Sequence, residues 1–294
     1  MLVLVSDPFG PDLPERLSRF GTVTDDKSRL AEAQVVLIRS KTQCRKDYID
    51  SAPKLELIIR GGVGMDNIDI PYAESKGIRC LNTADASSIA VAELVFALMM
   101  ALPNQLTRAD ASMREGKWIK KELKRTELFG KTLGILGLGR IGLTLAARAR
   151  AFHMQVLGWH PDVHYTEWAE ICPTMQEVLR RSDYVSLHVP LVDDTRGLIN
   201  RESLKLMKAG AYLINTARGQ IVVEEDVVHA LENGTLGGYA TDVWSSDPPE
   251  STPLLTAPNT ILTPHIGAST QENMGRIGDI VERLLEQHVA GRRA

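Results

Sequence analysis

Short apolar runs alternate along the chain with longer segments in which apolar residues recur every three or four positions. A short run bounded by polar or turn-forming residues predicts a β-strand, and the longer pattern predicts a helix. Early in the chain the predicted strands are Leu2–Val5, Val35–Ile38, Leu57–Ile59 and Arg79–Leu81, with helices at Leu13–Phe20 and Pro71–Lys76. A long apolar helix from about Ser88 to Leu102 follows them.

A second series of elements begins after a polar, basic stretch, Arg108 to Arg125. Its predicted strands are Leu133–Leu136, Gln155–Gly158, Tyr184–Leu187, Ala211–Asn215, Gly238–Thr241 and Thr260–Leu262. Its predicted helices are Met175–Arg181, Glu202–Met207, Glu224–Glu232 and a last one from about Gln271 to Val289. Strands that alternate with helices indicate parallel sheets covered on both faces. Two such series, separated by a long helix, therefore predict two α/β domains.

Composition narrows the class of protein. The 294 residues are 44% hydrophobic and 24% charged, with a formal net charge of −3, which argues against a nucleic acid or an anionic membrane as the main partner. The three cysteines are far apart and odd in number, so we expect neither a disulfide framework nor a metal site, and they favour a cytoplasmic location. The longest apolar run, Ile89 to Leu102, contains Glu93 and is too short to cross a bilayer.

The most informative motif is a G-x-G-x-x-G formed by Gly137, Gly139 and Gly142. It directly follows the predicted strand Leu133–Leu136, and a helix from Leu143 to Phe152 is expected to open on its last glycine. This order of strand, glycine-rich turn and helix is typical of a dinucleotide-binding site, where backbone N–H groups at the start of the helix hold the pyrophosphate.

Three later motifs place polar residues at the ends of apolar strands. They lie at residues 215–219 (NTARG), 241–249 (TDVWSSDPP) and 262–267 (LTPHIG). The carboxyl ends of parallel strands meet at one edge of a sheet, so Arg218, Asp247 and His265 are expected to lie together there. Arg218 would bind a substrate carboxylate, His265 would exchange a proton with a carbonyl oxygen, and Asp247 would orient the imidazole. Each has an ordinary structural explanation alone, but jointly they predict reduction of a 2-keto acid.

Two further features stay open at this stage. His188 ends a strand and would either line an adenine pocket or simply pack. The basic run Lys117 to Arg125 is typical of a solvated surface, with the alternative that part of it reaches the substrate.

The same motifs resemble the D-2-hydroxyacid dehydrogenase family, most closely its D-3-phosphoglycerate dehydrogenase branch. The matching segments cover nearly the whole chain: Arg60–Asp69, Asp85–Glu93, Ala111–Trp118, Thr126–Gly142, Asn215–Gly219 and Thr263–Thr270. The resemblance implies two doubly wound parallel-sheet domains, with a Rossmann cofactor domain (93–271) inserted into a flavodoxin-like substrate domain (1–92 and 272–294). It also implies a homodimer, NAD as cofactor and a place in serine biosynthesis.

By position, the resemblance implies roles for individual residues. Arg218 would bind substrate and His265 would be the acid–base, while the backbone of Gly62, Val63 and Gly64 would take the substrate carboxylate. Arg39, Arg60 and Lys120 would be the contacts to a substrate phosphate. Asp242 would hold the nicotinamide carboxamide. The complete set expected at the cofactor is Gly137, Gly139, Arg140, Ile141, Gly142, His160, His188, Val189, Pro190, Thr195, Thr216, Ala217, Asp242 and Gly267.

The chain departs from the family pattern at two positions. The partner of the catalytic histidine is usually glutamate, whereas this chain has Asp247, one methylene shorter, with Glu250 as a reserve candidate. An NAD enzyme usually has an acid about 20 residues after the fingerprint to hold the ribose 2′-OH. Here His160 takes that place, with Asp162 two residues later, so NAD is favoured and NADP stays possible.

The sequence thus predicts an NAD(P)-dependent D-2-hydroxyacid dehydrogenase that interconverts 3-phosphoglycerate and 3-phosphohydroxypyruvate. The alternatives are an NADPH-dependent glyoxylate/hydroxypyruvate reductase and a non-catalytic dinucleotide-sensing protein on the same fold. Because the chain ends at residue 294, a C-terminal serine-sensing region is not expected.

Overall fold

The computed structural model describes residues 1–291 and divides the chain into two compact units. The first unit comprises Met1–Ala90 together with the chain from Ala268 onward, and the second comprises Val91–Gly267. Each unit is an α/β structure built on a parallel sheet, so the predicted fold class is confirmed.

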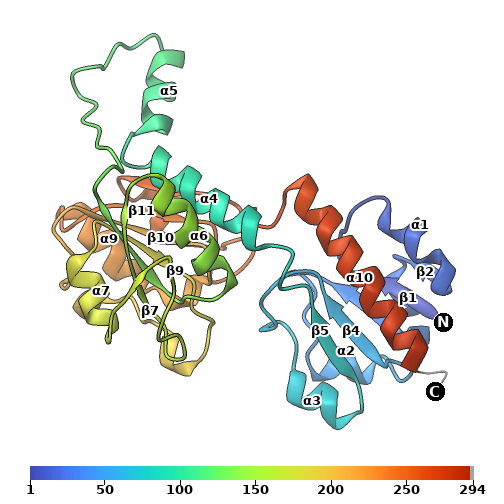
Figure 1. The fold of residues 1–294 in the computed structure, drawn as a ribbon. Helices are drawn as coiled ribbons and strands as arrows, with labels where there is room; N and C mark the ends of the chain where they lie inside the picture. The colour runs from blue at the N-terminus through green and yellow to red at the C-terminus, as the bar shows by residue number, and fades with distance from the viewer. Residues whose placement is uncertain (292–294) are drawn as a thin grey trace. The chain divides into compact units, whose positions relative to one another are not determined.

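The first unit contains a five-stranded sheet in the order β2-β1-β3-β4-β5 (Figure 1). Its strands are β1 (Leu2–Val5), β2 (Thr22–Thr24), β3 (Val35–Ile38), β4 (Leu57–Arg60) and β5 (Arg79–Asn82). Its α-helices are α1 (Leu13–Leu17), α2 (Lys46–Asp50), α3 (Ile70–Ser75) and α10 (Gln271–Gly291). The direction of winding reverses between β1 and β3, which makes the carboxyl ends of these two strands a topological switch point.

Alternate residues of each strand bury opposite faces of this sheet. Val3, Leu37 and Ile59 pack with Leu13 of α1 and Ile277 of α10. The other face is covered by α2 and α3, through side chains that include Ile49 and Ala73. Because both faces are covered, the polar groups of this unit concentrate at the ends of the strands.

The second unit contains a seven-stranded sheet in the order β12-β11-β10-β9-β6-β7-β8. Its strands are β6 (Thr132–Leu136), β7 (Gln155–Trp159), β8 (Glu170–Ile171), β9 (Tyr184–Leu187), β10 (Ala211–Asn215), β11 (Leu236–Thr241) and β12 (Thr260–Leu262). Its α-helices are α4 (Ser88–Ala101, which begins in the first unit), α5 (Leu106–Arg114), α6 (Arg140–Ala151), α7 (Met175–Arg181), α8 (Arg201–Leu204) and α9 (Glu224–Glu232). The switch point of this sheet lies between β6 and β9.

Two hydrophobic clusters hold the second sheet. Helices α4 and α6 pack on one face through residues such as Val95 and Leu145, and α7, α8 and α9 pack on the other through residues such as Val178 and Val227. Among the described residues, no single helix has the length and apolarity to cross a membrane; only α4 and α5 taken together, with a 63° bend, meet that test.

The predicted start of the fingerprint helix was wrong. Helix α6 begins at Arg140 with Gly139 as its N-cap, rather than at Leu143, so Gly142 lies inside the first turn. A helix that starts on the second glycine presents its free N–H groups at the turn where a pyrophosphate would sit, which a later start would not do.

Among the other elements that were not predicted are one helix and two edge strands. Helix α5 falls in the stretch expected to be only polar and basic, and it projects from the body of the second unit (Figure 1). Its apolar side chains Leu106 and Met113 are exposed, so the sequence shows no core-facing stripe there. The edge strands β2 and β8 have three and two residues, too few for a recognisable apolar run.

Candidate active site

The fingerprint glycines are required by close backbone contacts. Gly137 has φ 101°, and a Cβ on it would lie 2.6 Å from the backbone of His188. A Cβ on Gly142 would lie 2.2 Å from the carbonyl oxygen of Gly137. Both positions therefore exclude any larger residue, which explains the spacing of the motif in terms of packing.

Gly139 differs from its two neighbours in the motif. A Cβ there would meet no atom within 4 Å, and φ is −75°, so neither packing nor backbone strain requires glycine. The open space lies at the start of α6, where the N–H groups of Arg140, Ile141 and Gly142 precede the first intrahelical hydrogen bond. Open space beside the N–H groups at the start of a helix fits the pyrophosphate of a dinucleotide.

His160 follows the carboxyl end of β7, where a ribose is expected. Its Nδ1 accepts the backbone N–H of Asp162 at 3.0 Å. The neutral ring therefore carries its proton on Nε2, which makes that atom a hydrogen-bond donor. A donor at this position suits either a ribose hydroxyl or a 2′-phosphate.

The segment after β9 runs along the fingerprint turn. The His188 N–H donates to Leu136 O at 2.7 Å, and its Nε2 pairs with the Ser186 hydroxyl at 2.8 Å. Burial lowers the pKa of His188 to about 4, so the ring is neutral near pH 7. The Thr195 hydroxyl donates to Pro190 O at 2.6 Å and closes the loop that follows Val189. The backbones of His188 and Val189 lie beside Gly137.

The loop after β10 is shaped by Asn215, a residue to which the sequence analysis gave no role. Its buried amide accepts the Ala217 N–H at 3.0 Å and donates to Arg218 O at 2.9 Å. The neighbouring Thr216 hydroxyl is buried and has no hydrogen-bond partner within residues 1–291. An orphaned hydroxyl here fits a ligand that contacts this loop, as expected for a dinucleotide.

Asp242, at the end of β11, is buried and holds the loop that carries His265. Its carboxylate accepts the Thr263 hydroxyl at 2.6 Å and the N–H groups of Ile266 at 2.8 Å and Gly267 at 2.7 Å. Two carboxylate oxygens offer about four acceptor positions. One acceptor position remains, as the contact to a nicotinamide carboxamide implied by the family resemblance requires.

His265 and Asp247 form a direct side-chain hydrogen bond between Nδ1 and Oδ2. Both side chains are about 30% exposed, at 29% and 31%. His265 has φ 57°, a left-handed conformation that is uncommon outside glycine and that the hydrogen bonds to Asp242 maintain. Glu250 is exposed and makes no hydrogen bond within residues 1–291, so the shorter Asp247 is the carboxylate that contacts the histidine.

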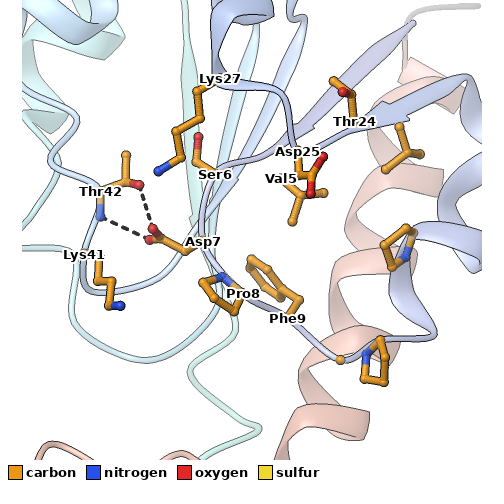
Figure 2. A pocket seen from close by; sticks show the side chains of 14 residues that line it. Val5, Ser6, Asp7, Pro8, Phe9, Thr24, Asp25, Lys27, Lys41 and Thr42 are labelled. Atoms are coloured by element: carbon orange, nitrogen blue, oxygen red, sulfur yellow. Dashed lines mark hydrogen bonds between the residues drawn. The ribbon is translucent and has the colours of Figure 1, made fainter.

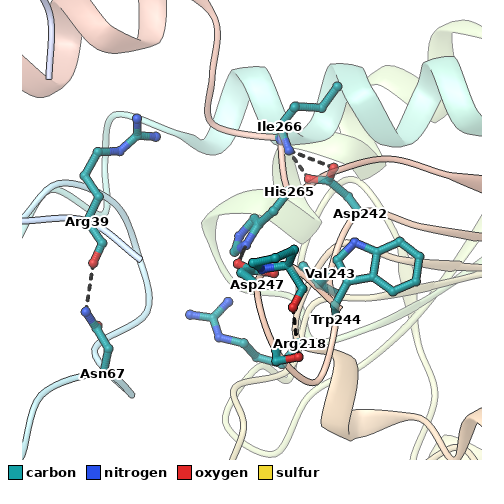
Figure 3. Close-up of polar contacts among 12 residues, drawn as sticks. Arg39, Asn67, Arg218, Asp242, Val243, Trp244, Asp247, His265 and Ile266 are labelled. Carbon is teal, nitrogen blue, oxygen red and sulfur yellow. Dashed lines mark hydrogen bonds and ion pairs between the residues drawn. The ribbon is translucent and has the colours of Figure 1, made fainter. Parts of the chain in front are cut away.

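Arg218 projects to the same side of the second unit as His265 and Asp247 (Figure 3). Its Nη1 donates to Ala217 O at 2.6 Å, which orients the guanidinium. Because Nδ1 of His265 is engaged by Asp247, Nε2 is the imidazole atom that can exchange a proton. The three residues expected from consecutive strand ends therefore form one cluster of a guanidinium, an imidazole and a carboxylate.

In the first unit, the loop after β4 differs from expectation in the number of backbone N–H groups that it leaves for a substrate. The Gly62 N–H donates to Thr83 Oγ1 at 2.8 Å, so it is not available to a substrate carboxylate. The N–H groups of Val63 and Gly64 donate to no group within residues 1–291, and Asn82 fixes their loop through Val63 O at 2.7 Å. Two amides remain for the predicted role, rather than three.

The predicted phosphate contacts have three different environments. Arg60 is buried, and its guanidinium lies over Gly62, where a Cβ would approach Nη1 within 1.6 Å. Arg39 is half-buried, and its guanidinium makes no hydrogen bond or ion pair to residues 1–291. Lys120 is exposed on the loop after α5 in the second unit. Of the three, Arg39 has the arrangement typical of an anion-binding residue.

One group of potential metal ligands occurs in the described residues, at Glu170, Cys172 and Glu177. Arg181 donates to Glu170 and to Glu177, in both cases at 2.7 Å, and so already occupies the space between the two carboxylates and offsets part of their charge. An ion would have to displace a guanidinium, which makes this a structural ion-pair group.

Comparisons with known proteins agree with this arrangement. Residues 96–267 match the family described as "D-isomer specific 2-hydroxyacid dehydrogenase, NAD binding domain". A D-3-phosphoglycerate dehydrogenase of Methanocaldococcus jannaschii is 40% identical over 98% of this chain, and this chain spans 57% of that relative's length. A hydroxypyruvate reductase of Thermotoga maritima is 41% identical over 88% of this chain and 86% of its own. The crystal structure of an Aquifex aeolicus D-lactate dehydrogenase with NAD and lactic acid matches with a TM-score of 0.87, at 29% identity over 99% of this chain and 96% of its own.

Proposed function

The chain belongs to the D-isomer-specific 2-hydroxyacid dehydrogenase family, and on that premise we propose that it interconverts a 2-hydroxy acid and a 2-keto acid with NAD. The observation that carries the proposal is the His265–Asp247 hydrogen bond beside Arg218 in a unit that also holds the dinucleotide fingerprint. A protein that only senses a dinucleotide would need the fingerprint but not the histidine, the carboxylate and the arginine. We also propose that the first unit is the substrate domain and the second the cofactor domain.

Arg218, His265 and Asp247 each have a separate role in the proposed reaction. Arg218 binds the substrate carboxylate and polarises the carbonyl with its planar set of donors. The bound nicotinamide supplies the hydride that reaches C2 of the keto acid. His265 gives its Nε2 proton to the carbonyl oxygen as negative charge develops there, and Asp247 stabilises the imidazolium before that transfer. In the reverse direction, neutral His265 accepts the hydroxyl proton.

For the substrate we propose 3-phosphoglycerate and 3-phosphohydroxypyruvate. The support is Arg39: its guanidinium is half-buried with no hydrogen-bonded acceptor within residues 1–291, and its burial lowers its pKa, with the charge of Asp7 opposing the shift. A desolvated cation of this kind gains most from a dianionic phosphate. Arg60 and Lys120 stay as secondary candidates for that phosphate.

A keto-acid panel tests the substrate. We expect kcat/KM for phosphohydroxypyruvate to exceed that for hydroxypyruvate, glyoxylate and pyruvate by at least about tenfold, since one charge-assisted hydrogen bond contributes about 1.5–3 kcal/mol. Equal values across the panel would remove the phosphate from the proposal and leave the dehydrogenase.

The alternative substrate and cofactor have one observation each in their favour. The hydroxypyruvate reductase is as similar to this chain as the phosphoglycerate dehydrogenase, and His160 replaces the acid that would repel a 2′-phosphate. Matched titrations of NADH and NADPH, followed by nicotinamide fluorescence, separate the cofactors. A reductase that uses NADPH would bind it at least as tightly as NADH and would prefer the unphosphorylated acid.

We further propose that the protein is a cytoplasmic homodimer. On the projecting helix α5 and the loop that follows it, several apolar side chains are exposed, including Leu106 at 52%, Met113 at 56% and Trp118 at 77%. Exposed apolar side chains on a projecting arm are typical of a protein interface. The cytoplasmic location is supported by Cys44, Cys80 and Cys172, all free thiols.

A further inference from the structure

The turn after β3, Arg39 to Thr42, is held from one side by Asp7. Its Oδ2 accepts the N–H of Arg39 at 2.6 Å. Oδ2 also accepts the N–H of Thr42 at 3.1 Å, and Oδ1 accepts the Thr42 hydroxyl at 2.7 Å (Figure 2). Asp7 is only 4% exposed and follows the end of β1. One buried carboxylate therefore fixes both ends of the turn.

Asn67 holds the same turn from another side. Its Nδ2 donates to Arg39 O at 2.8 Å (Figure 3). The same Nδ2 donates to Thr42 O at 2.7 Å. Asn67 is 6% exposed and lies three residues after Gly64, in the loop that follows β4. It thus connects the turn that carries Arg39 to the loop that carries the amides of Val63 and Gly64.

One side of this turn borders open space. Lys41 and Thr42 line a pocket of about 910 Å³ beside the loops that follow β1 and β2 (Figure 2). A turn that borders open space can move into it when its hydrogen bonds are lost. The hydrogen bonds to Asp7 and Asn67 therefore determine where Arg39 lies.

We propose that Asp7 and Asn67 are positioning residues that set the distance between the Arg39 guanidinium and the amides of Val63 and Gly64. This inference rests on the proposed function, in which Arg39 binds the phosphate, and on the role that the family resemblance implies for the two amides, which would bind the substrate carboxylate together with Arg218. The fixed distance selects three-carbon 2-keto acids with an anionic group on C3. A shorter acid without that group engages the amides alone, and its turnover is insensitive to the position of Arg39.

The test compares two substrates in matched variants. In Asn67→Ala, the partly buried carbonyls of Arg39 and Thr42 lose a donor and the turn is released, so kcat/KM for phosphohydroxypyruvate falls about ten- to a hundredfold, mainly through KM. For hydroxypyruvate the loss is about threefold or less. Thr42→Val, which removes the hydroxyl and keeps the shape, gives the same selective loss, and Thr42→Ser restores the wild-type preference.

Two controls separate positioning from general destabilisation. Asp183→Asn alters a carboxylate that likewise accepts a backbone N–H, that of Thr132 at 2.8 Å, in the second unit, and it leaves the ratio of the two kcat/KM values unchanged. In an Arg39→Ala background, Asn67→Ala affects both substrates equally, because the group that it positions is gone.

Equal losses for both substrates in the single variants, or no loss in either, would overturn the proposal while the proposed function stands. A wild-type enzyme with no preference for phosphohydroxypyruvate would instead overturn the proposed substrate, and the positioning role with it. Thermal unfolding of each variant shows whether it is folded before its kinetics are compared.

Discussion

At the scale of single residues, the site depends on side chains whose hydrogen bonds leave one defined atom available. His265 is the main example: Asp247 engages Nδ1, and Asp242 holds the flanking N–H groups, so Nε2 is left for the substrate. The substitution of aspartate for the usual glutamate does not remove this contact. Geometry therefore favours catalysis over a purely dinucleotide-sensing role.

Replacement of Asp247 tests this directly. Asp247→Asn keeps the size of the side chain but cannot stabilise an imidazolium, so kcat should fall by about 10²–10⁴. The affinity for NADH, measured by fluorescence titration, should stay within about twofold. Glu250→Gln is the control and should retain wild-type kcat. If Glu250→Gln lowered kcat as much as Asp247→Asn does, Glu250 would be a functional carboxylate partner of His265.

The fingerprint glycines allow a second test, because they are glycine for different reasons. Gly142→Ala places a Cβ 2.2 Å from a backbone oxygen, so it should lower the free energy of unfolding by about 1–3 kcal/mol. Gly139→Ala meets no atom within 4 Å, so it should unfold like the wild type and yet bind NADH at least about tenfold more weakly. Denaturant unfolding and NADH titration measure the two effects, and a Gly139→Ala protein with normal NADH affinity would contradict this account of the turn.

At the scale of elements, His188, which follows β9, makes the stability of the protein depend on pH. Burial lowers the pKa of His188 from 6.5 to about 4, while in the unfolded chain it keeps its ordinary value. Between those values the unfolded state binds a proton that the native state does not, so stability falls as the pH falls from about 6.5 toward 4. The contribution is at most about 3 kcal/mol.

His188→Asn should therefore lose less stability than the wild type when the pH is lowered from 7.5 to 5. Urea unfolding at both pH values measures the difference. An unchanged pH dependence in the variant would show that His188 titrates normally in the folded protein.

The sequence predicted most central strands, because each is an apolar run between polar turns. It did not predict α5, because that helix projects and its apolar residues do not face a core. The start of α6 was misplaced because Gly142 resembles a helix boundary in sequence, while in the structure it is a packing requirement inside the first turn. The pattern of apolar and polar residues therefore predicts a helix or strand well where burial determines which residue types the element contains.

The candidate site was predictable to the extent that its residues lie at strand ends. Arg218, Asp247 and His265 follow successive strands, so their meeting follows from parallel topology. The hydrogen bonds of Asp7 and Asn67 join residues 25 to 35 positions apart and have no local signature. The engagement of the Gly62 amide by Thr83 was missed for the same reason.

At the scale of the whole molecule, one topological rule locates both groups of residues. In the first unit, Asp7 and Arg39 follow β1 and β3, the strands at its switch point, and in the second unit the fingerprint and His188 follow β6 and β9. Open parallel sheets bind ligands at these positions. Both units therefore place candidate ligand-binding residues at the same topological position.

The proposed dimer is a property of the whole molecule and can be tested by sedimentation. The double variant Met113→Asp, Trp118→Asp should sediment as a single chain where the wild type has twice that mass, since charges in an apolar interface are strongly unfavourable. Tyr165→Asp, at an 83% exposed side chain outside the arm, should sediment like the wild type. A dimer that survives the double variant would place the interface elsewhere.

The central claim is hydride transfer from the nicotinamide to C2 of a 2-keto acid, and an isotope experiment tests it most directly. The enzyme is supplied with phosphohydroxypyruvate and NADH deuterated at the transferable position of C4, and the product is analysed by NMR and by its configuration. The account predicts D-3-phosphoglycerate with deuterium at C2. A product without deuterium at C2, a product of L configuration, or no product with any 2-keto acid would contradict it.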